Sequence, residues 1–175
     1  MTAAPREQTL SDRPSEIERR YSAGAERPLG SYMILMGTYG ALVGALSALA
    51  RLRRAPLPTR VPAADLALLT VGTYRASRLI AKDSITAFLR APFTRFEEPA
   101  GSGEVNEEVI GRGLRHAIGE WISCPFCIAV WIATVGAFGL VMFPRATRLA
   151  CSILAAASGS DALQFAHARL QDADS

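Results

Sequence analysis

The stretch WISCPFCIAVWIATVGAFGLVMF, from Trp121 to Phe143, contains no charged side chain, and the nearest charges are Glu120 before it and Arg145 after it. A helix needs roughly 20 apolar residues in succession to cross a hydrocarbon layer about 30 Å thick. The stretch therefore predicts a membrane span near residues 121–143. Trp121 is expected to anchor one end at the interface between lipid and water.

The composition of the whole chain is that of a membrane protein. Half of its 175 residues are hydrophobic and 20% are charged, and the apolar residues are gathered in blocks. A second charge-free run, between Arg27 and Arg51, predicts another span near residues 29–50. Basic residues are spread between the apolar blocks and interleaved with acids, so we expect no nucleic-acid partner.

Two further blocks, near residues 61–81 and 147–168, are apolar but carry charged side chains. With them, the chain is predicted to be an all-α integral membrane protein of about four transmembrane helices. Residues 1–28 are polar and balanced in charge, which is typical of a disordered tail. The predicted membrane domain covers residues 29–168, and residues 169–175 form a short tail. Basic residues near the helix ends place both termini in the cytoplasm.

The charges in the two weaker blocks need an explanation, because a lone charge at the bilayer centre costs about 2.5–3.5 kcal/mol on insertion scales. Arg75 and Arg78 are near the end of block 61–81, so their long side chains can extend to the lipid headgroups, and we favour this interpretation. The alternative is an intramembrane charge pair. Arg75 and Arg78 share a helix face, and Asp161 in the last block could neutralise either of them.

The segment of residues 82–120, between the second and third spans, is predicted to lie in the membrane interface. Apolar and basic side chains are mixed between Ile85 and Phe96, in a pattern typical of an interfacial helix that Pro92 would end. Pro99 to Gly103 is expected to be a flexible joint. A second surface helix is expected where apolar residues recur at every fourth position, at Ile110, Leu114, Ile118 and Ile122.

Two stretches are similar to a known family: TYRASRLIAKDSITAFLRAPFTRFE at Thr73–Glu97, and CPFCIAVWIA at Cys124–Ala133. They resemble an uncharacterised bacterial family catalogued as domain of unknown function thirteen-sixty, which includes a sporulation protein. The resemblance covers roughly Asp65 to Gln164. It implies a small multi-pass protein of a bacterial cell membrane, the inner membrane, and it brings no catalytic or ligand residue.

The candidate chemical site is the pair Cys124 and Cys127. Pro125 suits the first position of a helix, so Cys124 is the expected cap and Cys127 lies in the first turn. A pair that serves packing is the favoured interpretation. A redox pair is the second, because a helix N-terminus lowers a thiol pKa and makes the sulfur nucleophilic. A zinc site is the third, with His116 joining the two cysteines, although a closed site needs a fourth ligand.

These observations predict a membrane component without enzymatic activity, in contact with the lipid bilayer and associated with itself or with other membrane proteins. No cofactor is expected. The first alternative is a thiol–disulfide exchange protein that uses Cys124 and Cys127. The second is an accessory subunit of a transporter that uses the charged side chains of Arg75, Arg78 and Asp161.

Overall fold

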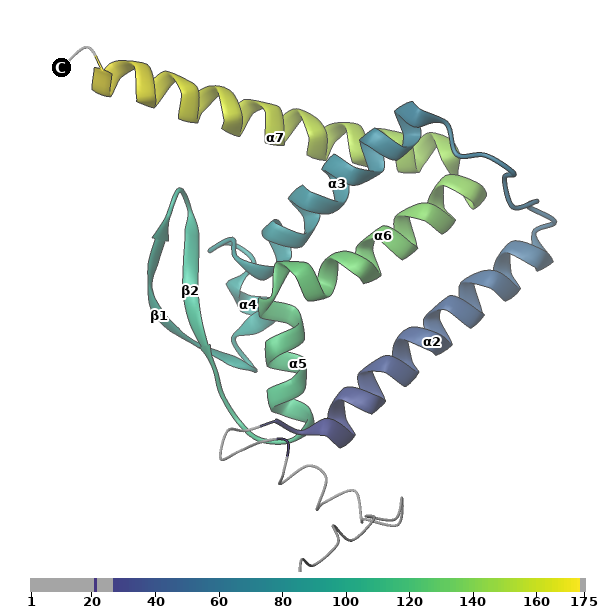
Figure 1. Cartoon of the computed structure of the whole chain (residues 1–175), viewed down its shortest axis with the longest axis horizontal. Helices are drawn as coiled ribbons and strands as arrows, with labels where there is room; N and C mark the ends of the chain where they lie inside the picture. The colour runs from purple at the N-terminus through teal and green to yellow at the C-terminus, as the bar shows by residue number, and fades with distance from the viewer. Residues whose placement is uncertain (1–20, 22–26, 174–175) are drawn as a thin grey trace, which may run out of the picture.

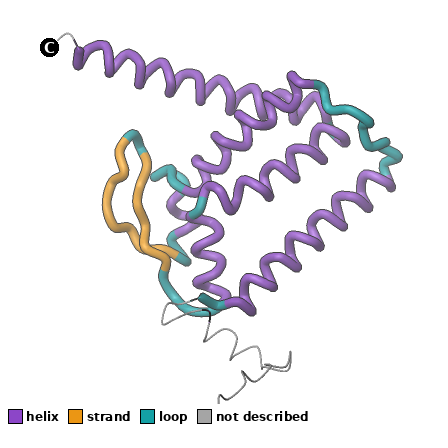
Figure 2. The backbone as a smooth tube through the Cα atoms, viewed as in Figure 1, coloured by secondary structure: helices purple, strands orange, loops and turns teal. Residues whose placement is uncertain are grey.

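The computed structural model describes Tyr21 and residues 27–173 (Figures 1 and 2). Its helices are α2 (Leu29–Leu52), α3 (Ala63–Ala81), α4 (Ala87–Arg90), α5 (Leu114–Ser123), α6 (Pro125–Met142) and α7 (Pro144–Ala173). The strands β1 (Thr94–Gly101) and β2 (Glu104–Val109) form an antiparallel hairpin. The all-α prediction is thus right for most of the described chain and wrong for this hairpin. The predicted tail of residues 1–28 lies almost wholly outside the described residues.

Three of the described helices, α2, α6 and α7, are long and apolar enough to cross a membrane. Helix α3 is not among them, because it carries three charged residues, Asp65, Arg75 and Arg78. Three of the four predicted spans are therefore supported, and a span at residues 61–81 stays a prediction. This segment does form a helix, and it packs along both α6 and α7 (Figure 1).

Small residues let these helices approach one another closely. A Cβ atom added to Gly72 of α3 would lie 3.1 Å from the sulfur of Cys151 in α7. A Cβ atom on Gly139 of α6 would lie 2.7 Å from Oγ1 of Thr147, near the start of α7. Glycine at such crossings brings two backbones into contact, and the three helices α3, α6 and α7 are thereby joined in one bundle.

Helix α2 lies beside α6 and contacts it through a few side chains. The hydroxyl groups of Tyr39 and Thr134 are 2.8 Å apart, and the rings of Tyr39 and Trp131 meet edge to face with centroids 5.2 Å apart. At the far end, the guanidinium group of Arg53 lies 4.5 Å from the centre of the Phe143 ring. These contacts run in the same order along both helices, so α2 and α6 point the same way. Helix α3, which comes between them in the sequence, runs back in the opposite direction on the other side of α6 (Figure 1).

Residues 82–123, which we call the cap, are folded differently from the prediction. The interfacial helix expected from Ile85 to Phe96 is reduced to the four residues of α4, a turn follows, and β1 begins at Thr94. The expected second surface helix is present only as α5. The chain then bends at Cys124 before α6 starts, so the span predicted at 121–143 begins inside α5. Helix α7 continues beyond the predicted limit to Ala173.

The predicted flexible joint is the tight turn of the hairpin. Gly101 pairs with Glu104, which leaves Ser102 and Gly103 as the two turn residues. Both have positive φ, 51° and 82°, as required by the type I′ turns that favour the twist of a hairpin. The amide of Ser84 also donates to the carbonyl of Gly103 over 3.0 Å. This hydrogen bond attaches the turn to the segment that follows α3.

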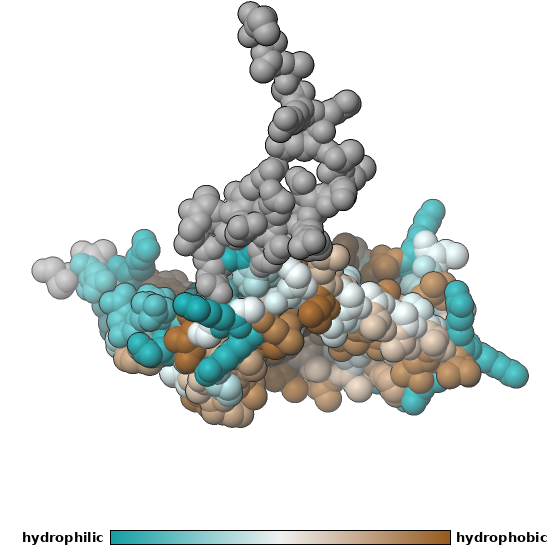
Figure 3. Space-filling model, turned by 90° about the horizontal axis from the view of Figure 1, so that it is seen from below, coloured by the Kyte–Doolittle hydropathy of each residue, from teal (hydrophilic) through white to brown (hydrophobic). Residues whose placement is uncertain are grey.

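The apolar helices leave most of their side chains uncovered by protein. In each of α2, α6 and α7, only 6% of the most apolar 18-residue stretch is buried inside the protein. Met33 is 75% exposed and Phe126 is 87% exposed. On the face drawn in Figure 3, hydrophobic side chains occupy the middle and hydrophilic ones gather at both ends. A water-soluble protein rarely exposes continuous apolar surface of this kind, so the helices need a covering that the described chain does not supply.

Candidate functional site

Cys124 and Cys127 are placed by the start of α6. Cys124 is the N-cap residue and Pro125 is the first helical residue, as predicted. The amide of Cys127 donates to the sulfur of Cys124 over 3.3 Å, and the two sulfur atoms lie 2.6 Å apart. Cys127 is exposed and Cys124 is partly buried, and the interpretation as a packing pair stays a prediction. Cys151 lies elsewhere, buried against Gly72.

A cleft of about 790 Å³ lies beside the two cysteines, between α2 on one side and α5 and α6 on the other. Five of its lining side chains are aromatic, namely Tyr21, Tyr32, Tyr39, Trp121 and Trp131. The rings of Trp121 and Trp131 meet edge to face with centroids 4.9 Å apart. Both cysteines and several aliphatic side chains complete the lining. The thiol pair therefore faces an apolar, aromatic space.

The polar end of this cleft is centred on Glu120, at the end of α5. Arg27 donates to one carboxylate oxygen over 3.0 Å, and the hydroxyl of Tyr32 donates to the other. The pKa of Arg27 is raised, first by its hydrogen bond with Tyr32 and then by the negative charge of Glu120. Glu120 thus ties the start of α2 to the cap.

The structure does not assemble the predicted zinc site. Nε2 of His116 lies 3.6 Å from the carboxylate of Glu120, one helical turn further along α5. Among Tyr21 and residues 27–173, no group of three or more His, Cys, Asp and Glu side chains is placed to hold a metal ion. A tetrahedral zinc site needs four ligands, so Cys124 and Cys127 remain two ligands without a third.

The structure separates the predicted charge cluster into two ion pairs. Arg75 of α3 contacts Asp161 of α7, with Nη1 and Oδ2 2.7 Å apart. Arg78 instead contacts Glu104 of β2, and its Nε donates over 2.8 Å. Both arginines and Asp161 line a second cavity of about 980 Å³ between α3, α7 and the hairpin tip. That the pair of Arg75 and Asp161 lies within a bilayer stays a prediction.

A third ion pair joins the opposite end of the bundle. Nε and Nη2 of Arg148, near the start of α7, donate to the two carboxylate oxygens of Asp65 in the first turn of α3, each over 2.7 Å. Such a bidentate contact between guanidinium and carboxylate fixes the relative orientation of the two groups and also pairs their charges. The sequence analysis did not identify this pair.

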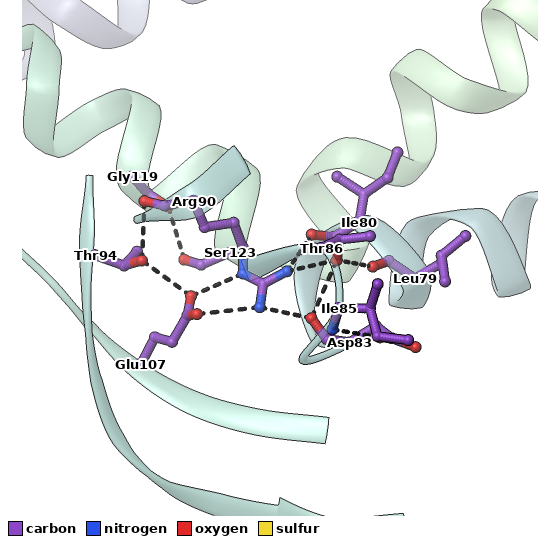
Figure 4. A network of polar contacts seen from close by, with 10 residues as sticks. All are labelled: Leu79, Ile80, Asp83, Ile85, Thr86, Arg90, Thr94, Glu107, Gly119 and Ser123. Atoms are coloured by element: carbon purple, nitrogen blue, oxygen red, sulfur yellow. Dashed lines mark hydrogen bonds and ion pairs between the residues drawn. The ribbon is translucent and has the colours of Figure 1, made fainter. Parts of the chain in front are cut away.

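Arg90 is the largest fully buried side chain in the described part of the chain, at 0% exposure (Figure 4). Its Nε and Nη2 donate to the two carboxylate oxygens of Glu107, over 2.7 and 3.1 Å. Its Nη1 donates to the carbonyl of Ile80 and to the hydroxyl of Thr86, over 2.6 and 3.0 Å. A second bond from Nη2 reaches the carbonyl of Asp83 over 2.9 Å. All five N–H groups of this guanidinium therefore have an acceptor.

This network joins the segments of the cap. Arg90 ends α4, Glu107 lies on β2, and the two carbonyl groups belong to the chain leaving α3 (Figure 4). The hydroxyl of Thr94 on β1 lies 3.0 Å from Oε2 of Glu107 and 3.0 Å from the carbonyl oxygen of Arg90. The sequence analysis expected an interfacial helix around Arg90 and did not identify Glu107 as its partner. The alternation of Val105, Glu107 and Val109 is the signal that could have indicated a strand.

Comparison with known proteins matches residues 68–167 to a family model described as "Protein of unknown function (DUF1360)". The sporulation protein YjcA of Bacillus subtilis (strain 168) is 33% identical over 95 residues, which cover 53% of this chain and 80% of YjcA. The UPF0713 protein YngL of the same organism is 30% identical over 100 residues, covering 57% and 75%. No solved structure gives a significant match. The matched region runs from α3 into α7 and leaves α2 outside it.

Proposed function

The chain belongs to the DUF1360 family of proteins of unknown function, and we propose that it is a multi-pass component of a bacterial membrane that associates with another membrane helix through α2. The observation that carries this proposal is the open, small-residue face of α2. A Cβ atom added to Gly37, Gly40 or Gly44 would have no other atom within 4 Å. The spacing of Gly40 and Gly44 is one that lets a second helix approach closely in lipid.

The direction of the helices supports insertion in a bilayer. Helices α2 and α6 point the same way, so the chain must return between them, and α3 makes that return. Its Arg75 is paired with Asp161 of α7 instead of facing outward alone. Pairing lowers the cost of placing an arginine at membrane depth. The cap would then lie on the side of the bilayer at which α2 and α6 begin. Basic residues near the helix ends favour the cytoplasm for that side.

Association is tested with the full chain in lipid nanodiscs or mild detergent, by measuring its mass and by energy transfer between differently labelled copies. Gly40→Leu and Gly44→Leu place bulk on the open face and should weaken self-association at least about tenfold. Gly159→Leu is the matched control, because Gly159 of α7 also has open space around it.

Two outcomes would contradict the proposal. One is a wild-type chain that stays monomeric at all concentrations and retains no partner when captured from native membranes. The other is an equal loss of association in Gly40→Leu and Gly159→Leu, because association would then not depend on the α2 face.

A second candidate function is thiol–disulfide exchange at Cys124 and Cys127. The observation that favours it is the 2.6 Å separation of two sulfur atoms beside a cleft, with Cys127 exposed. A disulfide requires sulfur atoms about 2.05 Å apart, so the pair can close with little movement. Alkylation of the thiols in intact cells, with and without a reductant, tests it. A pair that exchanges should change its state, and thiols that stay reduced under every condition would exclude the function.

A further inference from the structure

The cleft beside Cys124 and Cys127 has the size and lining of a site for a small molecule. Its volume of about 790 Å³ lies within the roughly 300–1,000 Å³ of typical ligand pockets. Its wall is mainly apolar and aromatic, and it ends at the polar cluster around Glu120. Ligand sites commonly combine an apolar wall with a few polar groups that fix orientation. A molecule in this cleft would lie against both sulfur atoms.

We propose that this cleft binds a lipid-soluble quinone, which oxidises the thiol pair. The inference rests on the thiol–disulfide exchange function proposed above. In the reaction the S–H bonds of Cys124 and Cys127 break and one S–S bond forms between them. The two electrons and two protons pass to the quinone, whose carbonyl oxygens become the hydroxyl groups of a quinol.

Three features of the cleft favour a quinone over a lipid acyl chain, which could fill the same volume. The aromatic side chains of Trp121 and Trp131 offer faces and edges against which a flat ring can pack. The cleft also has a polar end, where Arg27 and Tyr32 meet Glu120. The carbonyl oxygens of a quinone suit such an end, whereas an acyl chain has no polar atom to place there. A quinone also accepts the two electrons that a closing thiol pair releases.

The position of the cleft fits a ligand that arrives through lipid. It lies between α2 and α6, two of the helices apolar enough to cross a membrane, and near the ends at which both helices begin. A ring with an apolar tail could therefore enter between these helices and place its polar oxygens near the cap. The thiols at the start of α6 would meet the ring at that depth.

The test uses the full chain in nanodiscs, reduced and then mixed with decylubiquinone. Disulfide formation is followed by thiol alkylation and peptide mass, and quinol formation by absorbance. We expect one quinol for each Cys124–Cys127 disulfide. Val130→Trp places a large ring in the cleft lining and should slow the quinone reaction about tenfold or more. Val135→Trp is the matched control, because Val135 is also about half exposed on α6 but does not line the cleft.

Diamide, a small water-soluble thiol oxidant, separates the two proposals. It should form the disulfide in the wild type and in both variants, and the circular-dichroism spectrum of each variant checks that it is folded. If diamide closes the pair but decylubiquinone does not, or if Val130→Trp reacts with decylubiquinone as fast as the wild type, the quinone inference is wrong and thiol exchange stands. If neither oxidant joins Cys124 to Cys127, thiol exchange itself is wrong.

Discussion

In the cap, Arg90 is wholly buried and each of its N–H groups has an acceptor, whereas in α2 the side chain of Met33 is three-quarters exposed and the nearby glycines face open space. The cap is held by directional bonds between segments that are far apart in the sequence. The apolar helices touch one another through few contacts and expose surface that suits lipid. The comparison teaches that one chain can have a part whose shape is set internally and a part whose stability depends on its surroundings.

The largest effect is expected from removing the partner of the buried arginine. Glu107→Ala would leave Arg90 buried without its counter-charge, which typically costs about 3–5 kcal/mol. The free energy of unfolding can be measured in detergent micelles by urea titration with tryptophan fluorescence, because Trp121 lies in the cap and Trp131 packs against its ring. Glu108→Ala, an exposed neighbour on the same strand, should change it by less than about 0.5 kcal/mol. Equal effects of the two variants would mean that the network does not stabilise the cap.

The double variant Arg90→Met with Glu107→Leu sharpens this test. Replacing both members of a buried ion pair by apolar side chains of similar volume is often neutral or stabilising. We therefore expect the double variant to regain most of the stability that Glu107→Ala loses. A double variant as unstable as the single one would indicate that the five hydrogen bonds, and not only the charge balance, specify the fold of the cap.

The next largest effect distinguishes a cap glycine from a membrane glycine. A Cβ atom on Gly119 would lie 2.6 Å from Cγ1 of Val109 and 3.0 Å from the backbone oxygen of Phe93. Gly119→Ala should therefore cost about 1–3 kcal/mol through overpacking. Gly40→Ala meets no atom within 4 Å and should stabilise α2 by about 0.5–1 kcal/mol. The same urea titration measures the change in the free energy of unfolding for both variants. Changes of the same sign would contradict the difference expected between the two glycines.

Prediction from sequence succeeded where the determining signal is local. The charge-free runs identified α2 and α6, because length and polarity alone decide whether a helix suits a bilayer. Pro125 after Cys124 identified the start of α6 by the same kind of local rule. The thiol pair was identified as a candidate site from its spacing, but the cleft beside it depends on α2, which is remote in the sequence.

Prediction failed where contacts between distant residues decide the structure. Apolar residues between Ile85 and Phe96 suit an interfacial helix, but Arg90 among them binds Glu107, which is 17 residues away. That ion pair fixes β2 against the end of α3, and no helical periodicity records it. Gly101 to Gly103 has the composition of a linker, and only the pairing of the flanking strands makes it a turn. The pair of Asp65 and Arg148 was missed for the same reason, since 83 positions separate its members.

A smaller effect is expected at the ion pair inside the bundle. Asp161→Asn leaves Arg75 without its partner. Exposed pairs contribute about 0–1 kcal/mol, and a lone charge at the bilayer centre costs about 2.5–3.5 kcal/mol. Both side chains are partly exposed, so we expect a loss of about 1–2 kcal/mol in lipid nanodiscs. Glu97→Gln, on exposed β1, is the control. A larger loss in lipid than in detergent would support burial of this pair in the bilayer, and equal losses would argue against it.

The smallest effect is expected at the tip of the hairpin, because Gly101, Ser102 and Gly103 are all exposed. Ser102 has φ of 51°, a left-handed conformation that costs a non-glycine residue about 1–2 kcal/mol. Ser102→Gly removes this strain but adds about 0.5–1 kcal/mol of chain entropy to the unfolded state. The two terms nearly cancel, so urea titration should find a net stabilisation below about 1 kcal/mol. Gly103→Ala, at φ of 82°, adds the left-handed strain and lowers the chain entropy of the unfolded state, so it should destabilise the protein by less than about 1 kcal/mol. A loss of stability in Ser102→Gly would mean that the serine side chain itself stabilises the turn, and the hairpin tip would then belong with the cap's network of directional bonds.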